Sequence, residues 1–362
     1  MKPSQLLKTV DWTLWIATLL LLTAGITVIF SLTNESDNKI YINQMVFAIV
    51  GLILMAVVTF IDYRIWKNLS WMAYLTGILC LILVVIFGSY TFGARRWIDF
   101  GIFQFQPAEL MKPILIVTLS RYFSNINDFN WKRFIVCLVL IILPVILVLK
   151  QPDLGSASVL LVTSFILIAV ARIPKIYYVS LTIILLIAIP LAYISLRPYQ
   201  KQRLITFVNP ASDLSGSGYN VAQSKIAIGS GGIFGRGLGK GSQSQLQFLQ
   251  VAHADFIFAG LAEATGFIGS VGLLIVSSML VIRAFQIAKL SQDKFGMYIA
   301  FGISVQLIYQ MFINAGGNLG IVPVTGIPYP LVSFGGTALV MVLLEIGILE
   351  SIYLRHKKIR FK

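Results

Sequence analysis

Residues 11–32 read DWTLWIATLLLLTAGITVIFSL, an apolar run longer than a helix in a soluble core requires. About 20 consecutive apolar residues are needed to cross a hydrocarbon layer of about 30 Å. The run is also too long for the apolar part of a cleavable signal peptide. It therefore predicts a membrane-spanning helix near the N-terminus.

The whole chain shares this composition. Of its 362 residues, 57% are hydrophobic and 12% are charged, whereas about 25% are charged in an average soluble domain. So few polar side chains cannot cover a globule of this size, which excludes a disordered chain, a fibrous repeat and an ordinary cytosolic enzyme. We expect a single polytopic membrane domain, residues 1–362, with short connections and one longer loop.

Ten apolar runs have a length that suits a membrane crossing. Backbone groups in lipid must satisfy their own hydrogen bonds, so these runs are predicted to be helices. The predicted fold class is an all-α integral membrane protein with about ten transmembrane helices. The predicted spans lie near residues 11–32, 43–61, 71–89, 107–123, 134–149, 156–171, 176–196, 256–282, 295–314 and 329–354.

The net charge of +14 has two interpretations. In a soluble protein it would indicate a nucleic-acid partner, but in a membrane protein it is typical of basic residues gathered in cytoplasmic loops. We follow the second interpretation and expect no nucleic-acid partner. We expect the chain to lie in the inner membrane of the cell. Most basic residues fall in the inner connections if the N-terminus is cytoplasmic. An even number of helices then places the C-terminus in the cytoplasm as well.

The connection of about residues 197–254 is the exception among short loops, and loops of this length are usually functional. A short amphipathic helix is predicted around residues 219–228, on the outer surface. The glycine-rich run that follows ends near Lys240 but lacks the spacing of a phosphate-binding P-loop. It is either a loop whose backbone approaches phosphate or a mobile hairpin without a ligand.

Residues 251–259, VAHADFIFA, place Asp255 directly before an apolar run. The carboxylate could serve as a helix cap, or as a general base held at the membrane surface. His253 is expected to be structural or a hydrogen-bond partner. Glu263 lies about two helical turns further on, so no second carboxylate forms the close pair of a glycosidase.

Charged residues also open the fourth predicted span, where Glu109 and Lys112 are three residues apart and face the same way. Charges inside a membrane are costly, so this pair either holds helices together or borders a substrate cavity. Just upstream, Arg95 and Arg96 suit phosphate oxygens, and Trp97 suits a membrane interface. Residues 314–337 are rich in Gly and Pro, and such backbone is tolerated at membrane depth only beside protein or a wet cavity.

Taken together, these motifs resemble the SEDS family, the shape, elongation, division and sporulation proteins. The stretch 209–213 and the short termini are more similar to the elongation members than to the division members. Four blocks carry the resemblance: 93–97 with 106–109, GARRW and QPAE; 223–232, QSKIAIGSGG; 253–258, HADFIF; and 323–328, PVTGIP.

The resemblance implies a peptidoglycan glycosyltransferase that extends a glycan strand from lipid II at the outer face of the membrane, making β-1,4 links with inversion. It implies Asp255 as the catalytic base, and it implies a class B penicillin-binding protein as the cross-linking partner. We expect eight further residues to bind or border the lipid-linked substrate and its pyrophosphate. They are Arg96, Trp97, Glu109, Lys112, Arg203, Gln223, Lys225 and Lys240.

Three points stay open in the sequence. A divalent cation, Mg or Mn, could share the pyrophosphate charge, although no metal-ligand cluster is present. A flippase or transporter of lipid-linked precursors would also suit ten helices and a broken loop. A non-enzymatic scaffold for wall synthesis is the third class, and it would not require an acid and several bases at one place.

Overall fold

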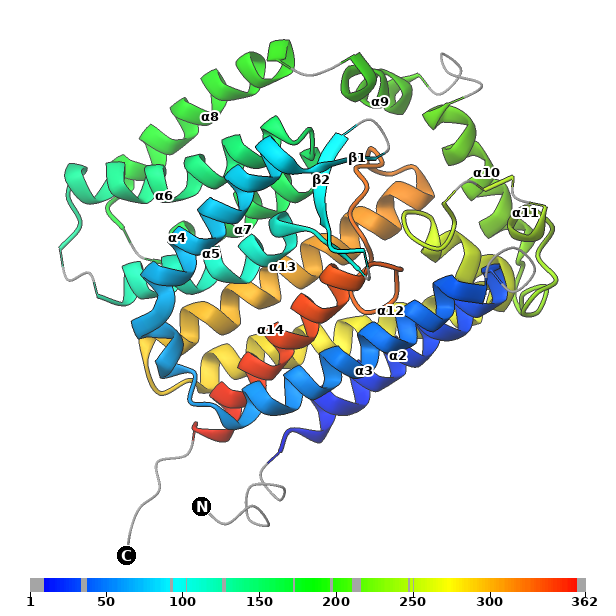
Figure 1. The fold of residues 1–362 in the computed structure, drawn as a ribbon, viewed down its shortest axis with the longest axis horizontal. Coiled ribbons are helices and arrows are strands. Elements are labelled where there is room, and N and C mark those ends of the chain that lie inside the picture. The colour runs from blue at the N-terminus through cyan, green and yellow to red at the C-terminus, as the bar shows by residue number, and fades with distance from the viewer. Residues whose placement is uncertain are drawn as a thin grey trace, which may run out of the picture.

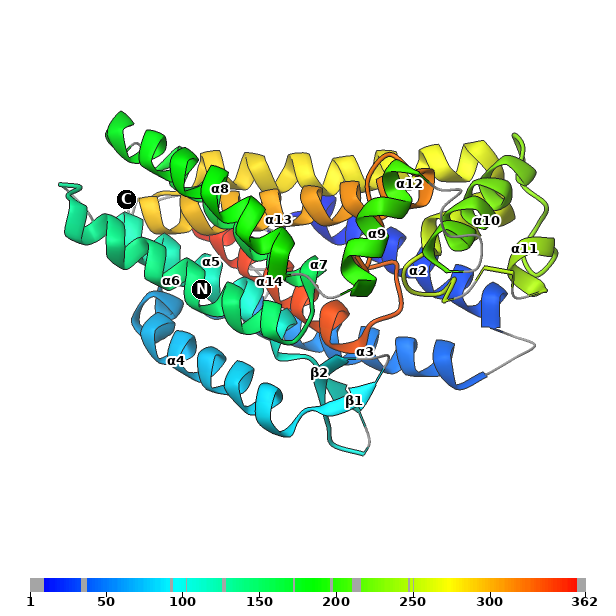
Figure 2. The same ribbon diagram turned by 90° about the horizontal axis from the view of Figure 1, so that it is seen from above.

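The computed structural model describes residues 10–33, 38–91, 94–101, 103–125, 128–171, 173–195, 198–209, 216–246, 248–249 and 251–356. Ten long helices in these ranges run back and forth through one bundle (Figures 1 and 2). Each coincides with one of the ten predicted spans. The ten helices are α2 (Trp12–Thr33), α3 (Asn38–Phe60), α4 (Arg64–Phe87), α5 (Pro107–Ser124), α6 (Trp131–Lys150), α7 (Leu154–Val170), α8 (Lys175–Ser195), α12 (Ile257–Leu290), α13 (Lys294–Leu319) and α14 (Gly336–Leu354).

The chain is an all-α membrane protein, as the sequence predicts. Seven of the described helices, α2, α3, α4, α6, α12, α13 and α14, are long and apolar enough to cross a membrane. Five predicted ends were wrong by five residues or more. Helices α3 and α4 begin earlier than predicted, at Asn38 and Arg64, and α13 ends later, at Leu319. The last helix begins at Gly336 rather than near residue 329, because prolines at 323, 328 and 330 cannot donate backbone hydrogen bonds. The helix predicted to end near residue 282 continues to Leu290.

A short antiparallel sheet follows α4, and the sequence analysis did not predict it. Its strands are β1 (Ser89–Thr91), β2 (Ala94–Asp99) and β3 (Gln104–Phe105), in the spatial order β1-β2-β3. Gly101 makes the turn between β2 and β3 with a φ of 80°, a conformation that glycine adopts without steric cost. The central strand carries Arg96 and Trp97.

The long connection between α8 and α12 is folded into helices. They are α9 (Pro198–Val208), α10 (Ser217–Ser230) and α11 (Ser242–Gln245). The helix predicted around residues 219–228 is confirmed as the middle of α10, which packs against α12 and α13. In Figure 1, α10 and α11 lie at the end of the bundle opposite to the start of α2 and the end of α14.

Helix α12 is broken at Gly266, whose φ of 68° and ψ of −162° are not helical. The glycine-rich loop 231–241 lies against this break, and a Cβ atom at Gly235 would be only 2.3 Å from the carbonyl oxygen of Ala264. The loop is therefore a packed part of the fold rather than a mobile hairpin. Four backbone hydrogen bonds of 2.8–3.2 Å join loop and helix, from Arg236 to Glu263, Gly237 to Ala264, Phe267 to Gly232, and Ile268 to Ile233.

Replacing Gly266 by Ala is expected to destabilise the protein by roughly 3 kcal/mol, because the left-handed backbone and the overpacking both oppose a side chain. Its Cβ atom would lie 2.3 Å from the Gly235 nitrogen. The measurement is the thermal unfolding midpoint in detergent. The matched control is Gly272→Ala on the same helix, where no atom lies within 4 Å of the added Cβ atom. Equal midpoints for the two variants would contradict the prediction.

The apolar core has two parts. One lies among α2, α3, α12, α13 and α14, and includes Leu21, Met55 and Leu343. The other lies among α4, α5, α6, α7 and α8, and includes Leu81 and Leu119. Helices α5 and α13 contribute to both parts, so they join the two halves of the bundle. Three segments lie near one another at one end of the molecule. They are the one before α7, the one before α12 and the one after α13.

Candidate active site

The site is centred on Asp255, in the turn before α12. Its backbone carbonyl accepts hydrogen bonds from the side-chain amides of Asn314, at 3.2 Å, and Asn318, at 2.9 Å, both on α13. Asn318 also accepts the backbone N–H of Ala259 at 3.0 Å, which aligns the first turn of α12. The N-cap of α12 is Phe256 and has no side-chain cap, so Asp255 does not fill the capping role left open by the sequence.

The residues beside Asp255 are held by the segment that precedes α14. Ser333 donates to the carbonyl of Ala254 at 2.8 Å, and the N–H of Phe334 donates to the carbonyl of His253 at 2.9 Å. The His253 ring packs edge-on against Phe334, with ring centroids 5.6 Å apart. Burial lowers the pKa of His253, so its imidazole is neutral near pH 7. This supports the prediction of a structural His253.

Two arginines and a second acid surround the Asp255 carboxylate. Burial raises the pKa of Asp255 above its ordinary value, Arg203 and Arg96 oppose that rise, and Asp153 adds to it. Gly326 lies between two of these groups: a Cβ atom there would be 3.8 Å from Asp255 Oδ2 and 3.9 Å from Arg203 Nη1. With a φ of 77°, Gly326 lets the backbone pass close to both charges.

A small pocket lies beside Asp255. Its water-accessible volume is about 10 Å³, close to the minimum that one water molecule requires. The Oδ1 atom of Asn314 and the Oγ1 atom of Thr325 are both buried, and neither has a hydrogen-bond partner among the described residues. The pocket is lined by Asp255, Ile313, Asn314, Gly317, Asn318, Val324, Thr325, Gly326 and Ile327.

The arginines reach this site from different elements. Arg96 on β2 donates to the carbonyls of Gln151 and Pro152, which lie between α6 and α7. Arg203 on α9 donates to the carbonyl of Val324 at 3.3 Å. Trp97 follows Arg96 on the strand and is half-buried. The structure therefore brings the predicted residues Arg96 and Arg203 together around Asp255.

The other predicted residues of the long connection lie further out. Lys225 on α10 is exposed, and its amino group lies against Gly320 at the C-terminal end of α13, where the helix dipole favours a cation. Gln223, on the same helix, is half-buried. Lys240 is exposed in the glycine-rich loop. None of these three lines the pocket at Asp255.

Glu109 and Lys112 form a buried ion pair on α5, with 2.6 Å between Lys112 Nζ and Glu109 Oε1. Both side chains are at most 5% exposed. A second buried acid, Glu345 on α14, is close enough to interact electrostatically with the pair and accepts two hydrogen bonds from Gln306. This cluster lies inside the bundle and does not line the pocket at Asp255.

Glu263 has a structural role that the sequence did not reveal. Its fully buried carboxylate accepts the backbone N–H groups of Gln243, at 2.9 Å, and Ser244, at 3.1 Å, together with the Ser244 hydroxyl. These are the first donors of α11, so Glu263 caps that helix from α12. The Glu263 carboxylate is thereby occupied by hydrogen bonds to α11, and it does not form a pair with Asp255.

The structure adds residues that the sequence analysis did not single out. Asp153, before α7, accepts the N–H of Ser156 at 3.0 Å and the side-chain amide of Gln106 at 3.0 Å. Asn314 and Asn318 are the amides that hold Asp255. A signal was present for both: Asp153 directly precedes a predicted span, and the two Asn residues are four apart, on one helical face, in an otherwise apolar run.

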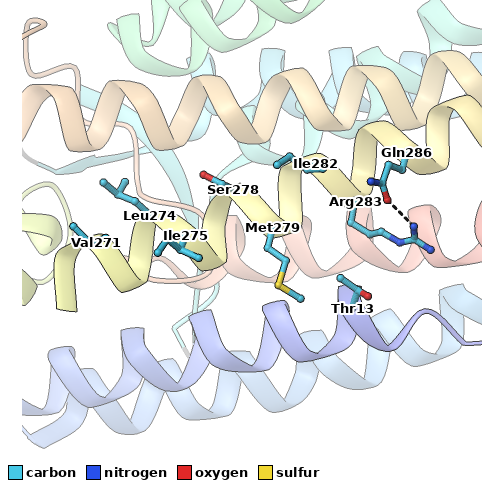
Figure 3. Close-up of a pocket in the computed structure, with 9 residues that line it drawn as sticks. All are labelled: Thr13, Val271, Leu274, Ile275, Ser278, Met279, Ile282, Arg283 and Gln286. Atoms are coloured by element: carbon cyan, nitrogen blue, oxygen red, sulfur yellow. Dashed lines mark hydrogen bonds between the residues drawn. The ribbon is translucent and has the colours of Figure 1, made fainter. Parts of the chain in front are cut away.

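A larger groove of about 530 Å³ lies elsewhere, between α2 and α12. Figure 3 shows apolar side chains along α12 and, at one end, Arg283 beside Gln286 and Thr13. Arg283 pairs with Asp11 and donates to Gln286 at 2.7 Å. The groove begins at Val271, beyond the break in α12 as seen from Asp255. It is therefore separate from the site, and its apolar lining suits contact with lipid.

Comparisons with known proteins show the family of this chain. A family model described as "Cell cycle protein", which covers FtsW, RodA and SpoVE, matches residues 5–358. The chain is 38% identical to the peptidoglycan glycosyltransferase MrdB of Escherichia coli (strain K12) over 310 residues, 85% of this chain and 84% of that protein. It is 35% identical to the stage V sporulation protein E of Bacillus subtilis (strain 168) over 355 residues, 94% of this chain and 96% of that protein.

Solved structures show the same fold. A chain from a structure on the coordination of polymerization and crosslinking by a peptidoglycan synthase complex has a TM-score of 0.81 and 28% identity, covering 96% of this chain and 98% of its own. The rod shape determining protein RodA of Thermus thermophilus has a TM-score of 0.72 and 28% identity, covering 95% of this chain and 96% of its own.

Proposed function

Because the chain belongs to the FtsW, RodA and SpoVE family of cell cycle proteins, we infer that it is a peptidoglycan glycosyltransferase and that Asp255 is its general base. The observation that supports the second inference is the placement of one carboxylate beside a pocket and two arginines. The likeness to the rod shape determining protein RodA of Thermus thermophilus favours a role in cell elongation.

The proposed reaction lengthens a glycan strand from lipid II. Asp255 takes the proton from the 4-hydroxyl of the acceptor sugar, and the oxygen attacks the anomeric carbon of the donor from the face opposite the leaving group. A β-1,4 bond forms with inversion, and the electron pair of the broken C–O bond leaves with polyprenyl pyrophosphate. The raised pKa of Asp255 makes its carboxylate a stronger base than an exposed aspartate.

Negative charge builds on the pyrophosphate as it leaves, and fixed cations lower the energy of that transition state. Arg96 and Arg203 are the cations nearest the base, so we assign the charge-stabilising role to them. Lys225 and Lys240 are exposed and suit contact with the substrate further out. Trp97 and Gln223 complete the proposed substrate-binding set, and the Glu109–Lys112 pair supports the site from inside the bundle.

We propose that a divalent cation, Mg or Mn, would bind only when the pyrophosphate of the substrate is present. Within the described ranges, no three His, Cys, Asp or Glu side chains are grouped so that they could hold a metal ion. The residues present therefore do not form a resident metal site, and no step of the proposed reaction depends on one.

We also propose where the protein lies in the cell and what it binds. We place the protein in the inner membrane, with Asp255 on the outer side and both termini in the cytoplasm, from the distribution of basic residues. The likeness to a chain of a peptidoglycan synthase complex supports a cross-linking partner, which we propose to be a class B penicillin-binding protein. The other proposed binding partners are lipid II, the growing strand and membrane lipid.

The deciding experiment uses the purified full chain in vesicles with fluorescently labelled lipid II, alone and with the candidate partner. Glycan chains that lysozyme digests would support a polymerase. Translocation of labelled lipid without polymer would indicate a flippase, and neither product in both samples would indicate a scaffold. Either of the last two outcomes would overturn the proposed function.

The polymerisation rate is expected to fall at low pH, with a midpoint above the ordinary aspartate value of 3.8, because burial raises the pKa of Asp255. The base must be ionised, so activity is retained above the raised pKa and lost as the pH falls through it. The measurement is kcat/KM against pH, which reports the free enzyme. A midpoint at or below 3.8 would contradict this assignment.

A further inference from the structure

The orientation of the Asn314 amide is fixed by its neighbours. Its nitrogen donates to two carbonyls, that of Asp255 at 3.2 Å and that of Ile327 at 2.9 Å. The opposite atom, Oδ1, is consequently an acceptor that cannot exchange places with the nitrogen. The side chain is 4% exposed, and Oδ1 has no donor among the described residues. An amide oxygen buried in this way costs free energy until a donor reaches it.

Thr325 brings a second such group to the same pocket. Its hydroxyl oxygen is also buried and without a hydrogen-bond partner in the described part of the chain. Thr325 lines the pocket together with Asn314 and Asp255. The three residues come from different segments, the loop after α13, α13 itself and the turn before α12. The residues that line this pocket of about 10 Å³ therefore include one with an obligate acceptor, one with an unpaired hydroxyl and Asp255, the proposed base.

We propose that this pocket binds one structural water that hydrogen-bonds to Asp255, Asn314 and Thr325 and serves both protonation states of the base. This inference rests on the proposed role of Asp255. The volume suits one molecule, and three polar partners are the usual number for a buried water. Thr325 and Asn314 are then positioning residues, because they act on the substrate only through the water and Asp255.

The hydrogen-bonding capacities of the partners match both states. Beside the Asp255 carboxylate, the water donates one hydrogen to Asp255 and one to Asn314, and it accepts from the Thr325 hydroxyl. After Asp255 has taken the sugar proton, the water accepts from the carboxylic acid and donates to Asn314 and to Thr325. Only the water and the hydroxyl rotate between the two states, since a hydroxyl can donate or accept while an amide oxygen can only accept.

The test is Thr325→Val, which keeps the shape of the side chain and removes only the hydroxyl. In the ionised state the water then loses the donor that the hydroxyl provided, and in the protonated state one water hydrogen lacks an acceptor. A buried hydrogen without an acceptor is costlier than an oxygen lone pair without a donor, so the acid form is the more disfavoured of the two. The midpoint of Asp255 titration should therefore fall, by up to about one pH unit, which corresponds to roughly one hydrogen bond. Thr325→Ser, which keeps the hydroxyl, should titrate like the wild type. If the Val variant is poorly folded, Thr325→Ala provides the same measurement.

Asp255 is titrated by infrared difference spectroscopy of its carboxyl group, with Asp255→Asn as the blank, and the pH profile of kcat/KM is recorded beside it. The charged groups that act on Asp255, namely Arg203, Arg96 and Asp153, are present in every variant and contribute equally. The neighbouring His253, whose ring packs against Phe334, is also unchanged. The control is Thr23→Val on the exposed face of α2. An unchanged midpoint in the Val or Ala variant, or a Ser variant that titrates like Val, would overturn the water site. The infrared readout needs no turnover, so a failed glycosyltransferase assay remains a separate result.

Discussion

Replacing Asp255 by Asn is expected to lower the rate of glycan polymerisation by at least about a hundredfold, the smaller end of the contribution of a general base. The amide has the shape of the carboxylate but cannot take the proton of the sugar hydroxyl. The protein should remain folded, because the hydrogen bonds from Asn314 and Asn318 use the backbone carbonyl of Asp255. The measurement is the initial rate of strand formation from labelled lipid II.

The control for this substitution is Asp128→Asn. Asp128 is an exposed acid in the connection between α5 and α6, at the other end of the bundle from Asp255. Its replacement removes the same charge from the chain without touching the site, and should leave the rate unchanged. An Asp255→Asn protein that is as active as the control variant would refute the base assignment.

Replacing Lys112 by Met is expected to destabilise the protein by about 3–5 kcal/mol, the usual effect of leaving one charge of a buried ion pair without its partner. Lys112 and Glu109 are 2% and 5% exposed, so water cannot take over the role of the lost ammonium group. The double variant Glu109→Gln with Lys112→Met should recover most of the loss, because neither member of the pair is then left charged without the other. Unfolding midpoints in detergent measure both effects.

Arg64→Met is the matched control for this prediction. Arg64 pairs with Asp293 at 3.3 Å, but the two side chains are 51% and 36% exposed. Such pairs contribute at most about 1 kcal/mol, so the midpoint should move little. If Lys112→Met left stability unchanged and abolished polymerisation, the pair would belong to the substrate cavity rather than to the helix packing.

Sequence reasoning identified the helices well because each has to satisfy its own hydrogen bonds in lipid, and that requirement leaves long apolar runs. It also singled out Asp255 and Arg96 as charges next to apolar runs, and Arg203 as a cation of the long connection, and the structure brings these three residues together. It could not predict that Asn314 and Asn318 hold Asp255. Their role depends on how α13 packs against the start of α12, and a single sequence carries no information on that contact.

The sequence analysis missed the short sheet and the capping role of Glu263 for a related reason. Strands of two to six residues give little periodic signal, and β2 is fixed by pairing with β1 and β3. Glu263 looks like a deep charge open to function, but residues of α11, about twenty positions earlier in the chain, satisfy its carboxylate. Both features depend on long-range pairing rather than on local pattern.

The back-and-forth course of the ten helices has a practical consequence for labelling. The first described helix, α2, begins at the end of the bundle opposite to α10 and α11, and the last, α14, ends there too (Figure 1). A fluorescent protein or an affinity tag fused at either end will therefore face the same compartment as its counterpart at the other end. Two such fusions on one molecule can exchange excitation energy, and neither is attached at the end where α10 and α11 lie.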